Sequence, residues 1–452
     1  MHTDNAGKGG SYLVWLAAIA AAALLWFGSG RDGSPPPVPA TRPNATPTPT
    51  ATVPPPTPVE RPLAADRPRP FPVAHDDRVS FPLIEHASPP ATAAEKSQWV
   101  GAQVCGECHE ANWKSSQDTS HYKTSRFPTR EALLGDYDIG ENRMTTGDAA
   151  LYFEMFRHDG AFYQRVIQDG REAHRAAVDL ILGSGKMAQT YGTWVKDALF
   201  ELPVTYYTPA SSWVYSPGYI DGRAYFARPI NSACLSCHTT GFVPVHASEK
   251  NYRYKSHHIL PGVTCERCHG KGGDHVAHHR AHPDEKAARF ILDPRGLSGK
   301  ERDSLCSQCH GGTSAEDGGS TALGAHSNNQ LQRLEKSLCF TRSDGLSCTD
   351  CHNPHRNERG NHQLFARRCQ KCHAVDDCTA VTPERRAHFT DHCAECHMPR
   401  QPMVDIERRT RSGEVLNGFL TRSGLAIPEI IDHYIRVVRT NESASVSAPL
   451  KL

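Results

Sequence analysis

The sequence predicts a mainly α-helical and irregular fold with a small β-rich insertion at about residues 147–228. Three observations support this prediction. Only 38% of the 452 residues are hydrophobic, so aliphatic packing alone does not explain the core of a chain this long. Short helical pieces and Gly-rich loops separate closely spaced Cys and His residues in the second half. Alternating apolar residues broken by turn signals occur in one stretch, the insertion.

The charge balance narrows the function. Fifty Lys and Arg residues stand against 49 Asp and Glu residues, and the chain has no polybasic block. Binding to nucleic acid by phosphate neutralisation requires a clustered excess of positive charge. We therefore expect no nucleic-acid partner.

Residues 1–30 are expected to form a signal anchor or a signal peptide. Residues 12–27 (YLVWLAAIAAAALLWF) are apolar throughout. Sixteen residues are short for a spanning helix and long for the apolar region of a secretory signal. No small-x-small cleavage pattern follows the run, which favours an N-terminal transmembrane helix that attaches the chain to the membrane.

The rest of the chain divides by composition. Fourteen of the 36 residues from Pro35 to Pro70 are proline, which predicts an extended linker or stalk without a core. The expected parts are a Pro/Thr-rich linker at 31–95, a first haem segment at 96–145, the β-rich insertion at 146–230, a six-haem region at 231–440 and a flexible tail at 441–452.

Hairpin signals define the β-rich insertion. The run LYFEMFRHDGAFYQRVIQDG predicts two strands joined at Asp159-Gly160, because Asp-Gly favours the tight turns of hairpins. Asp169-Gly170 and Asp221-Gly222 predict further hairpin turns, around strands such as Leu199 to Tyr206 and Arg223 to Ala227.

Fourteen of the sixteen cysteines follow one pattern, Cys-x-x-Cys-His, which occurs seven times. The spacing of these motifs is too irregular for a solenoid repeat. The motifs are Cys105/Cys108/His109, Cys234/Cys237/His238, Cys265/Cys268/His269, Cys306/Cys309/His310, Cys348/Cys351/His352, Cys369/Cys372/His373 and Cys393/Cys396/His397. We number them motifs 1 to 7.

Each motif predicts one covalently attached haem c, seven in total. Two thiols at this spacing form thioethers to the two vinyl groups of a haem, and the adjacent His supplies the proximal iron ligand. A zinc site would use the cysteine pairs two at a time and would not need the His. Redox dithiols occur singly, and a disulfide framework does not explain seven following histidines. Seven large apolar macrocycles are expected to supply much of the core.

The distal ligands decide between electron transfer and catalysis, because an open sixth position can bind a small molecule. His355 and His275 lie a few residues beyond a motif, where they can reach a neighbouring haem. His121 follows motif 1 by twelve residues, and His433 is expected on an apolar C-terminal helix. Weaker candidates are His388, His326 and His174, whereas His257, His258, His278, His279 and His282 are expected in solvent.

The segments GAQVCGECHEANWKSSQDTSH, GVTCERCHGKGGDH, LSCTDCHNPH and CAECHMPR resemble motifs of the multihaem cytochrome c superfamily. That superfamily includes doubled-CxxCH proteins, tetrahaem cytochromes of nitrifiers and tetratricopeptide-linked CxxCH cytochromes. The resemblance spans roughly 98–438 and implies bis-His haems in close pairs, with His121, His275, His355 and His433 at distal positions.

One segment departs from the family pattern. ILGSGKMAQTY is similar to a family segment in which a His follows the Gly-Ser-Gly turn, but this chain has Lys186 and Met187 there. Met187 is therefore either a distal ligand that raises the potential of one haem or a core residue. Cys339 and Cys378 flank the same pair of motifs, and in an oxidising compartment they are expected to form a disulfide.

The sequence thus predicts an exported, membrane-anchored seven-haem cytochrome on the periplasmic side that transfers electrons between unidentified donor and acceptor proteins. The alternative is a multihaem oxidoreductase acting on a small nitrogen or sulfur species such as nitrite, hydroxylamine or tetrathionate. Against it, no Cys-x-x-Cys-Lys motif of the nitrite-reductase type occurs. A structural subunit of a haem-protein filament is a third, weaker possibility.

Overall fold

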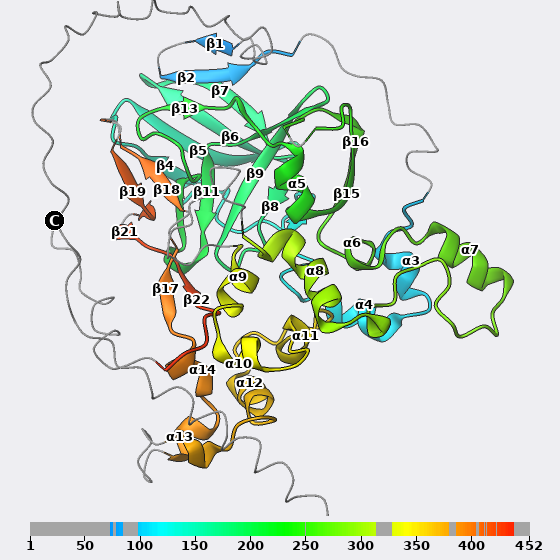
Figure 1. Cartoon of the computed structure of the whole chain (residues 1–452). Helices are drawn as coiled ribbons and strands as arrows, with labels where there is room; N and C mark the ends of the chain where they lie inside the picture. Colours follow the sequence, from blue (N-terminus) through cyan, green and yellow to red (C-terminus); the bar gives the residue numbers. More distant parts are fainter. Residues whose placement is uncertain are drawn as a thin grey trace, which may run out of the picture. The chain divides into compact units, whose positions relative to one another are not determined.

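The computed structural model describes residues 73–75, 78–84, 98–248, 250–312, 328–378, 386–403 and most of 406–437 (Figure 1). These residues belong to one compact unit, Pro68–Leu452. The expected anchor at 1–30, most of the linker and the tail at 441–452 lie outside them. Within the described ranges, no helix is long and apolar enough to cross a membrane.

The expectation of a mainly α-helical fold is wrong. The described residues are 28% strand and 27% helix. The helices are short, and most cover little more than one cysteine motif. Strands also occur well beyond the expected insertion, at Thr239–Pro244 and between Arg400 and Ile431.

The first sheet is a four-stranded antiparallel meander. Its strands are β4 (Arg143–Thr145), β5 (Leu151–His158), β6 (Ala161–Gln168) and β7 (Arg171–Ala177). The tight turns are those that the Asp-Gly pairs predict: Asp159 and Gly160 have φ of 48° and 78°, and Asp169 and Gly170 have 51° and 76°. Both residues of such a turn need positive φ, which Asp and Gly tolerate.

A seven-stranded sheet packs against the meander. Its order is β12 (Ser212–Tyr215), β11 (Val204–Tyr207), β9 (Ala188–Val195), β10 (Ala198–Glu201) and β14 (Arg228–Pro229), with β8 (Leu180–Leu182) joining β9 to β3 (Ser125–Arg126). Alternate side chains of the two sheets are buried together because successive strand residues point to opposite faces. This main core includes Leu151, Phe153, Met155, Val166, Ile181, Tyr191, Leu202, Val204 and Phe226.

Smaller strand groups complete the β structure. The turn at Asp221-Gly222 leads into β13 (Ala224–Tyr225), which pairs in parallel with β2 (Val79–Pro82) instead of closing the expected hairpin. β2 also pairs with β1 (Val73–His75). Four two-stranded ribbons are β15 (Thr239–Pro244) with β16 (Tyr254–Pro261), β17 (Arg400–Pro402) with β22 (Glu429–Ile431), β18 (Glu407–Arg409) with β19 (Val415–Asn417), and β20 (Phe419–Thr421) with β21 (Gly424–Ala426).

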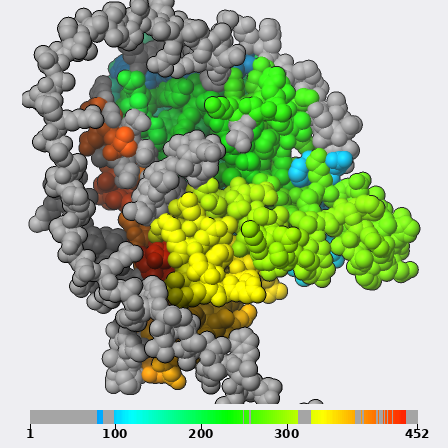
Figure 2. Space-filling model, in the orientation of Figure 1, coloured from blue at the N-terminus to red at the C-terminus, as the bar shows by residue number. Residues whose placement is uncertain are grey.

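The helices gather on one side of the sheets (Figure 1). They are α3 (Ala102–Gly106), α4 (Glu110–Ser116), α5 (Ser232–His238), α6 (Cys265–His269), α7 (Gly273–Ala281), α8 (Gly299–His310), α9 (Gln330–Leu334), α10 (Leu338–Arg342), α11 (Cys348–Cys351), α12 (His362–Cys369), α13 (Arg386–Thr390) and α14 (Cys393–His397). Figure 2 shows the yellow segment around α9 to α11 directly against the yellow-green segment of α7 and α8.

Candidate functional site

Each of the seven motifs is built on a short helix: α3, α5, α6, α8, α11, α12 and α14, in chain order. Residues three apart lie on the same face of a helix, so the turn presents both thiols to one side. The backbone N–H of the motif histidine then closes the turn on the carbonyl of the first cysteine. This bond is 2.9 Å from His109 to Cys105 and from His352 to Cys348, and 3.1 Å from His373 to Cys369.

Side-chain caps fix where three of these helices begin. Asn231 accepts a hydrogen bond from the backbone of Cys234, and Ser298 forms a capping box with Glu301 at the start of α8. Ser347 and Asp350 do the same at α11. Caps of this kind satisfy N–H groups that a helix start leaves without a partner. The motif residues are therefore held at defined helix ends.

The motif helices pack on one another in a series. α3 packs on α6, α5 and α11 pack on α8, and α12 packs on both α11 and α14. Asp303, buried in α8, accepts a 2.8 Å hydrogen bond from the backbone of Cys348 at the start of α11. Each motif therefore lies beside at least one other motif.

Cysteine contacts connect the motifs at the level of side chains. The neighbouring thiol of Cys105 lowers the pKa of Cys265 to about 7, and Cys265 in turn raises the pKa of Cys105. In the same way Cys309 lowers the pKa of Cys237 to about 6. Motif 1 is thus adjacent to motif 3, and motif 2 to motif 4.

Further contacts extend the series toward the C-terminus. The pKa of Cys268 is raised by burial and by nearby Cys306, whose thiol also raises the pKa of Cys348. The pKa of Cys369 is raised to about 11 by burial, then by Cys393 and Cys351. The order of neighbours is therefore motif 1, 3, 4, 5, 6 and 7, with motif 2 beside motif 4.

The second cysteines of motifs 1, 6 and 7 correct the expectation of a haem-filled core. Attachment thiols inside such a core would be buried, but Cys108, Cys372 and Cys396 are exposed, as is Cys234, the first cysteine of motif 2. The physical reason is their place in the series. Motifs 1 and 7 are its ends and motif 6 is next to an end, so other motif helices cover only part of α3, α12 and α14. Haems attached at these thiols would have an edge at the protein surface.

Four motif histidines face a second histidine from elsewhere in the chain. The ring centroids are 6.5 Å apart for His109 and His275, 6.1 Å for His310 and His121, 6.1 Å for His269 and His355, and 6.2 Å for His352 and His433. The four partners are the residues that the sequence analysis ranks first as distal ligands. In each pair the partner belongs to a different motif neighbourhood.

These separations fit a metal ion between the rings. A metal–imidazole bond is about 2 Å long, so two trans imidazoles on one ion place their ring centroids about 6 Å apart. Direct stacking without an intervening atom gives shorter separations of about 4.5 Å upward. The cysteine thiols and the paired rings are thus the donor set that a covalently bound haem requires.

Hydrogen bonds at the Nδ1 atoms fix the ring tautomer. Nδ1 of His269, His275, His397 and His433 lies 2.9, 2.8, 3.0 and 3.1 Å from the carbonyls of Leu292, Arg289, Arg436 and Ile431. A carbonyl can only accept, so Nδ1 must carry the proton. The lone pair is then on Nε2, where a metal ion can bind it.

Burial favours the neutral imidazole at several of these rings. It is the largest cause of the lowered pKa values of His121, His238, His355 and His433. It also lowers the pKa of His352 to about 4, with His433 as the second cause. Neutral imidazole is the form that binds a metal ion.

His433 does not lie on the expected apolar helix. It follows β22, in extended chain. The preceding residue, Asp432, is fully buried and accepts hydrogen bonds of 2.6 and 2.8 Å from Arg333 and Arg436. This ion-pair group attaches the His433 segment to α9, so His433 is oriented by two long-range contacts rather than by a helix face.

The weaker distal candidates are not brought to a motif where they are described. His174 on β7 stacks on Phe81 at 4.4 Å. Met187 packs against a core cluster that contains Tyr207 and Phe419. The side chains of His326 and His388 lie outside the described residues.

The expected disulfide between Cys339 and Cys378 is absent from the structure, and both thiols are free. Cys339 is near Cys351 and Cys369, whereas Cys378 is near Cys393. The two cysteines therefore lie beside different motif helices.

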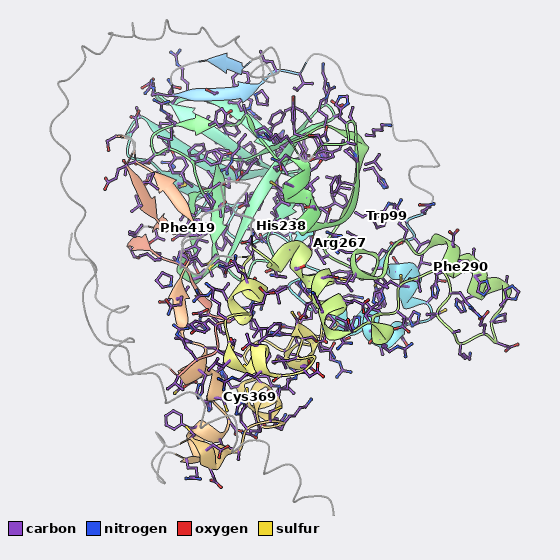
Figure 3. The ribbon with its side chains drawn as sticks, in the orientation of Figure 1. Trp99, His238, Arg267, Phe290, Cys369 and Phe419 are labelled. Atoms are coloured by element: carbon purple, nitrogen blue, oxygen red, sulfur yellow. The ribbon has the colours of Figure 1, made fainter. Side chains whose placement is uncertain are left out.

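Motifs 2, 6 and 7 differ from the four paired motifs. Within the described part of the chain, His238, His373 and His397 face no second histidine ring. His238 is half-buried, its Nδ1 is 3.3 Å from the hydroxyl of Thr124, and its carbonyl accepts a 2.5 Å bond from Ser125. Figure 3 places His238 between the strands and the helices.

The sequence analysis missed one group of donors. His362, His392 and Glu395 lie together, with one ligand atom of each within 4.8 Å of the others. A signal was present: His392 directly precedes Cys393, and His362 lies seven residues before Cys369. The analysis weighed neither histidine, because it looked for distal ligands mainly downstream of the motifs.

Comparison with known proteins gives one family match and a few distant relatives. The "Cytochrome c554 and c-prime" family matches residues 223–270, which contain motifs 2 and 3. The chain is 22% identical over 391 residues to the dissimilatory sulfite reductase MccA of Wolinella succinogenes, covering 68% of this chain. The chain spans only 52% of that relative's length.

Two solved structures are similar at low levels. The outer cell wall cytochrome OcwA matches with a TM-score of 0.43 at 14% identity, covering 77% of this chain and 82% of that one. The octahaem sulfite reductase MccA of Wolinella succinogenes matches with a TM-score of 0.31 at 14% identity, covering 61% and 47%.

Proposed function

Because this chain belongs to the multihaem cytochrome c superfamily, we propose that it carries seven covalent haems c and relays single electrons between two redox proteins. The single observation that carries this proposal is the set of four histidine pairs, each with ring centroids 6.1–6.5 Å apart. A bis-His haem with both axial positions filled transfers electrons and does not bind substrate at the iron.

The residues have distinct roles in this proposal. The two cysteines of each motif attach one haem, and the motif histidine is the proximal ligand. His275, His121, His355 and His433 are the distal ligands for motifs 1, 4, 3 and 5. The bound haems supply reversible one-electron oxidation and reduction. The chain fixes the spacing of these groups, excludes water around the buried imidazoles and holds the Nδ1 protons on carbonyl acceptors.

The order of the motif helices supports a relay. Neighbouring contacts run from motif 1 through motifs 3, 4, 5, 6 and 7, and motif 2 meets the series at motif 4. Each haem would therefore have a neighbour on the path. We place the two partner contacts at the ends of this series, near motif 1 and near motif 7. The exposure of Cys108 and Cys396 at these ends supports this placement, because a partner needs access to a haem edge.

We also propose that the protein acts outside the cytoplasm, on the periplasmic side or its equivalent. Haem attachment to cysteine pairs takes place on the exported side of the membrane, and sixteen cysteines suit an oxidising compartment only when most are covalently occupied.

A second candidate function is reduction of a small sulfur or nitrogen species at the haem of motif 2. The observation that favours it is the setting of His238, whose ring contacts a hydroxyl group and, among the described residues, no second imidazole. The sulfite reductase relative gives it further support.

Low-temperature EPR of the oxidised protein separates the two functions. A carrier should show low-spin signals that do not change when sulfite, nitrite or hydroxylamine is added. A high-spin signal that shifts on addition of one of these species would favour the enzyme. Absence of any haem signal would exclude both functions.

A further inference from the structure

We propose that His362, His392 and Glu395 form a binding site for a divalent late first-row transition metal ion, separate from the haems. Each residue offers one ligand atom, and these atoms lie within 4.8 Å of one another. Two imidazoles and one carboxylate suit Zn²⁺ and its neighbours in the first transition row, whereas Mg²⁺ and Ca²⁺ prefer oxygen donors. Three protein ligands leave further positions for water.

The ring geometry distinguishes this site from the haem pairs. The centroids of His362 and His392 are 5.2 Å apart, with the planes at 26°. The four proposed axial pairs have centroids at 6.1–6.5 Å. The shorter separation is too small for two imidazoles on opposite sides of one ion. It suits adjacent positions on a tetrahedral ion.

The fold holds the three donors from two directions. α12 begins at His362, and α14 has His392 at its N-cap and Glu395 in its first turn. Residues three apart share a helix face, so His392 and Glu395 point the same way. α12 packs on α14, and Gln363 donates a 3.3 Å hydrogen bond to Asp391 across the two segments. The donor set therefore does not depend on one loop.

The site is open to solution, and its spacing leaves room for an ion. His362 and Glu395 are exposed and His392 is half-buried. Nε2 of His392 is 3.9 Å from the carboxylate of Glu395, which is too long for a hydrogen bond between these two atoms. An ion about 2 Å from each atom fits between them. A metal ion can therefore enter from solvent and bridge the two groups.

The position of the site gives it a regulatory role. Glu395 lies between the two cysteines of motif 7, and His392 directly precedes the first of them. A bound cation adds positive charge beside this motif and so favours the reduced form of a group attached there. Metal binding would thus raise the reduction potential at one end of the relay. This consequence rests on the proposed function, whereas binding itself does not.

The test uses the full, haem-loaded chain titrated with Zn²⁺ by calorimetry, with zinc and iron counted by elemental analysis. One tight zinc per chain is expected. His362→Ala and Glu395→Gln should each weaken zinc binding by at least about tenfold. His158→Ala, which removes an exposed histidine on β5, is the matched control and should bind zinc as the parent does.

The outcomes separate this inference from the proposed function. Equal zinc affinity in His362→Ala and the parent would overturn the site. Loss of a low-spin haem signal in His362→Ala with unchanged zinc uptake would also overturn it, and would assign His362 to an iron. A redox titration should show one potential rising with Zn²⁺ in the parent and not in His362→Ala. A low haem count would instead contradict the proposed function, with zinc binding still measured.

Discussion

The imidazole of His433 shows how a single residue decides the chemistry of one haem in this account. Its ring centroid is 6.2 Å from that of His352, and Nδ1 is occupied by the carbonyl of Ile431. Removing this ring opens one axial position while the cysteine attachment stays intact.

We expect His433→Ala to convert one low-spin haem into a high-spin haem that binds cyanide. EPR and optical titration with cyanide measure this change. His158→Ala is the control, since His158 lies on β5, away from the motif helices. An unchanged spectrum in His433→Ala would show that His433 is not an iron ligand.

A second residue-scale prediction concerns Glu201 at the end of β10. Burial raises the pKa of its carboxyl to about 7, and Arg228 at 3.2 Å only partly opposes this shift. The unfolded chain has a pKa of about 4.5 for this group, so the folded state binds the proton more tightly. The stability contribution is therefore complete below pH 4.5 and is lost as the pH rises through about 7.

Glu201→Gln should remove this contribution to the pH dependence. Denaturant unfolding at several pH values between 4.5 and 8 measures it, and the variant should show a flatter profile than the parent. Two parallel profiles would contradict the assignment of the pKa to Glu201.

At the scale of elements, the buried ion-pair group of Asp432 attaches the C-terminal segment to α9. The Asp432 side chain is fully buried and bound by Arg333 and Arg436. Asp432→Ala leaves Arg333 without its buried partner, which is expected to cost about 3–5 kcal/mol. Glu110→Ala removes an exposed ion pair with Lys114 and should cost no more than about 0.5 kcal/mol.

Denaturant unfolding of the haem-loaded chains compares these two variants. Because Asp432 directly precedes His433, the Asp432 variant should also weaken the low-spin signal assigned to His433. A cost equal to that of Glu110→Ala would show that the group does not hold the segment.

The connection between β16 and α6 depends on one glycine. Gly262 has φ of 74°, and a Cβ there would overlap the backbone carbonyl of Tyr122. Gly160 has a similar φ of 78° but has open space around it. Gly262→Ala therefore adds a backbone clash to the strain that Gly160→Ala alone introduces.

We expect Gly262→Ala to destabilise the protein more than Gly160→Ala by about 1–3 kcal/mol. It should also reduce haem incorporation at motif 3, because α6 begins two residues after Val263. Thermal unfolding and a haem count for both variants measure this. Equal effects of the two substitutions would remove the clash from the argument.

For the whole molecule, sequence reasoning succeeds where a property depends on local spacing. Cys-x-x-Cys-His places its own thiols and imidazole on one turn, and Asp-Gly pairs specify the turns at Asp159 and Asp169. His121, His275, His355 and His433 could be ranked first because each lies within reach of a neighbouring motif.

Sequence reasoning fails where a property depends on distant pairing. Which motif each of these histidines faces is set by packing between α3, α6, α8 and α11, which no local pattern encodes. The same packing decides which motif thiols are covered, so the exposure of Cys108, Cys372 and Cys396 has no local signal either.

The C-terminal region shows the same limit for secondary structure. The residues around His433 were assigned to a helix from their apolar character. However, Glu429–Ile431 pair as β22 with β17, because a strand partner is available there. The short ribbons between Arg400 and Ile431 gave no signal strong enough to change the expected fold class.

The central claim is that seven motifs each attach one haem through carbon–sulfur bonds. Intact-mass spectrometry of the purified chain, before and after extraction with acidic acetone, tests it most directly. The account predicts a mass increased by seven haems, unchanged by extraction. A chain that carries no haem, or that loses its pigment to the solvent, would contradict it.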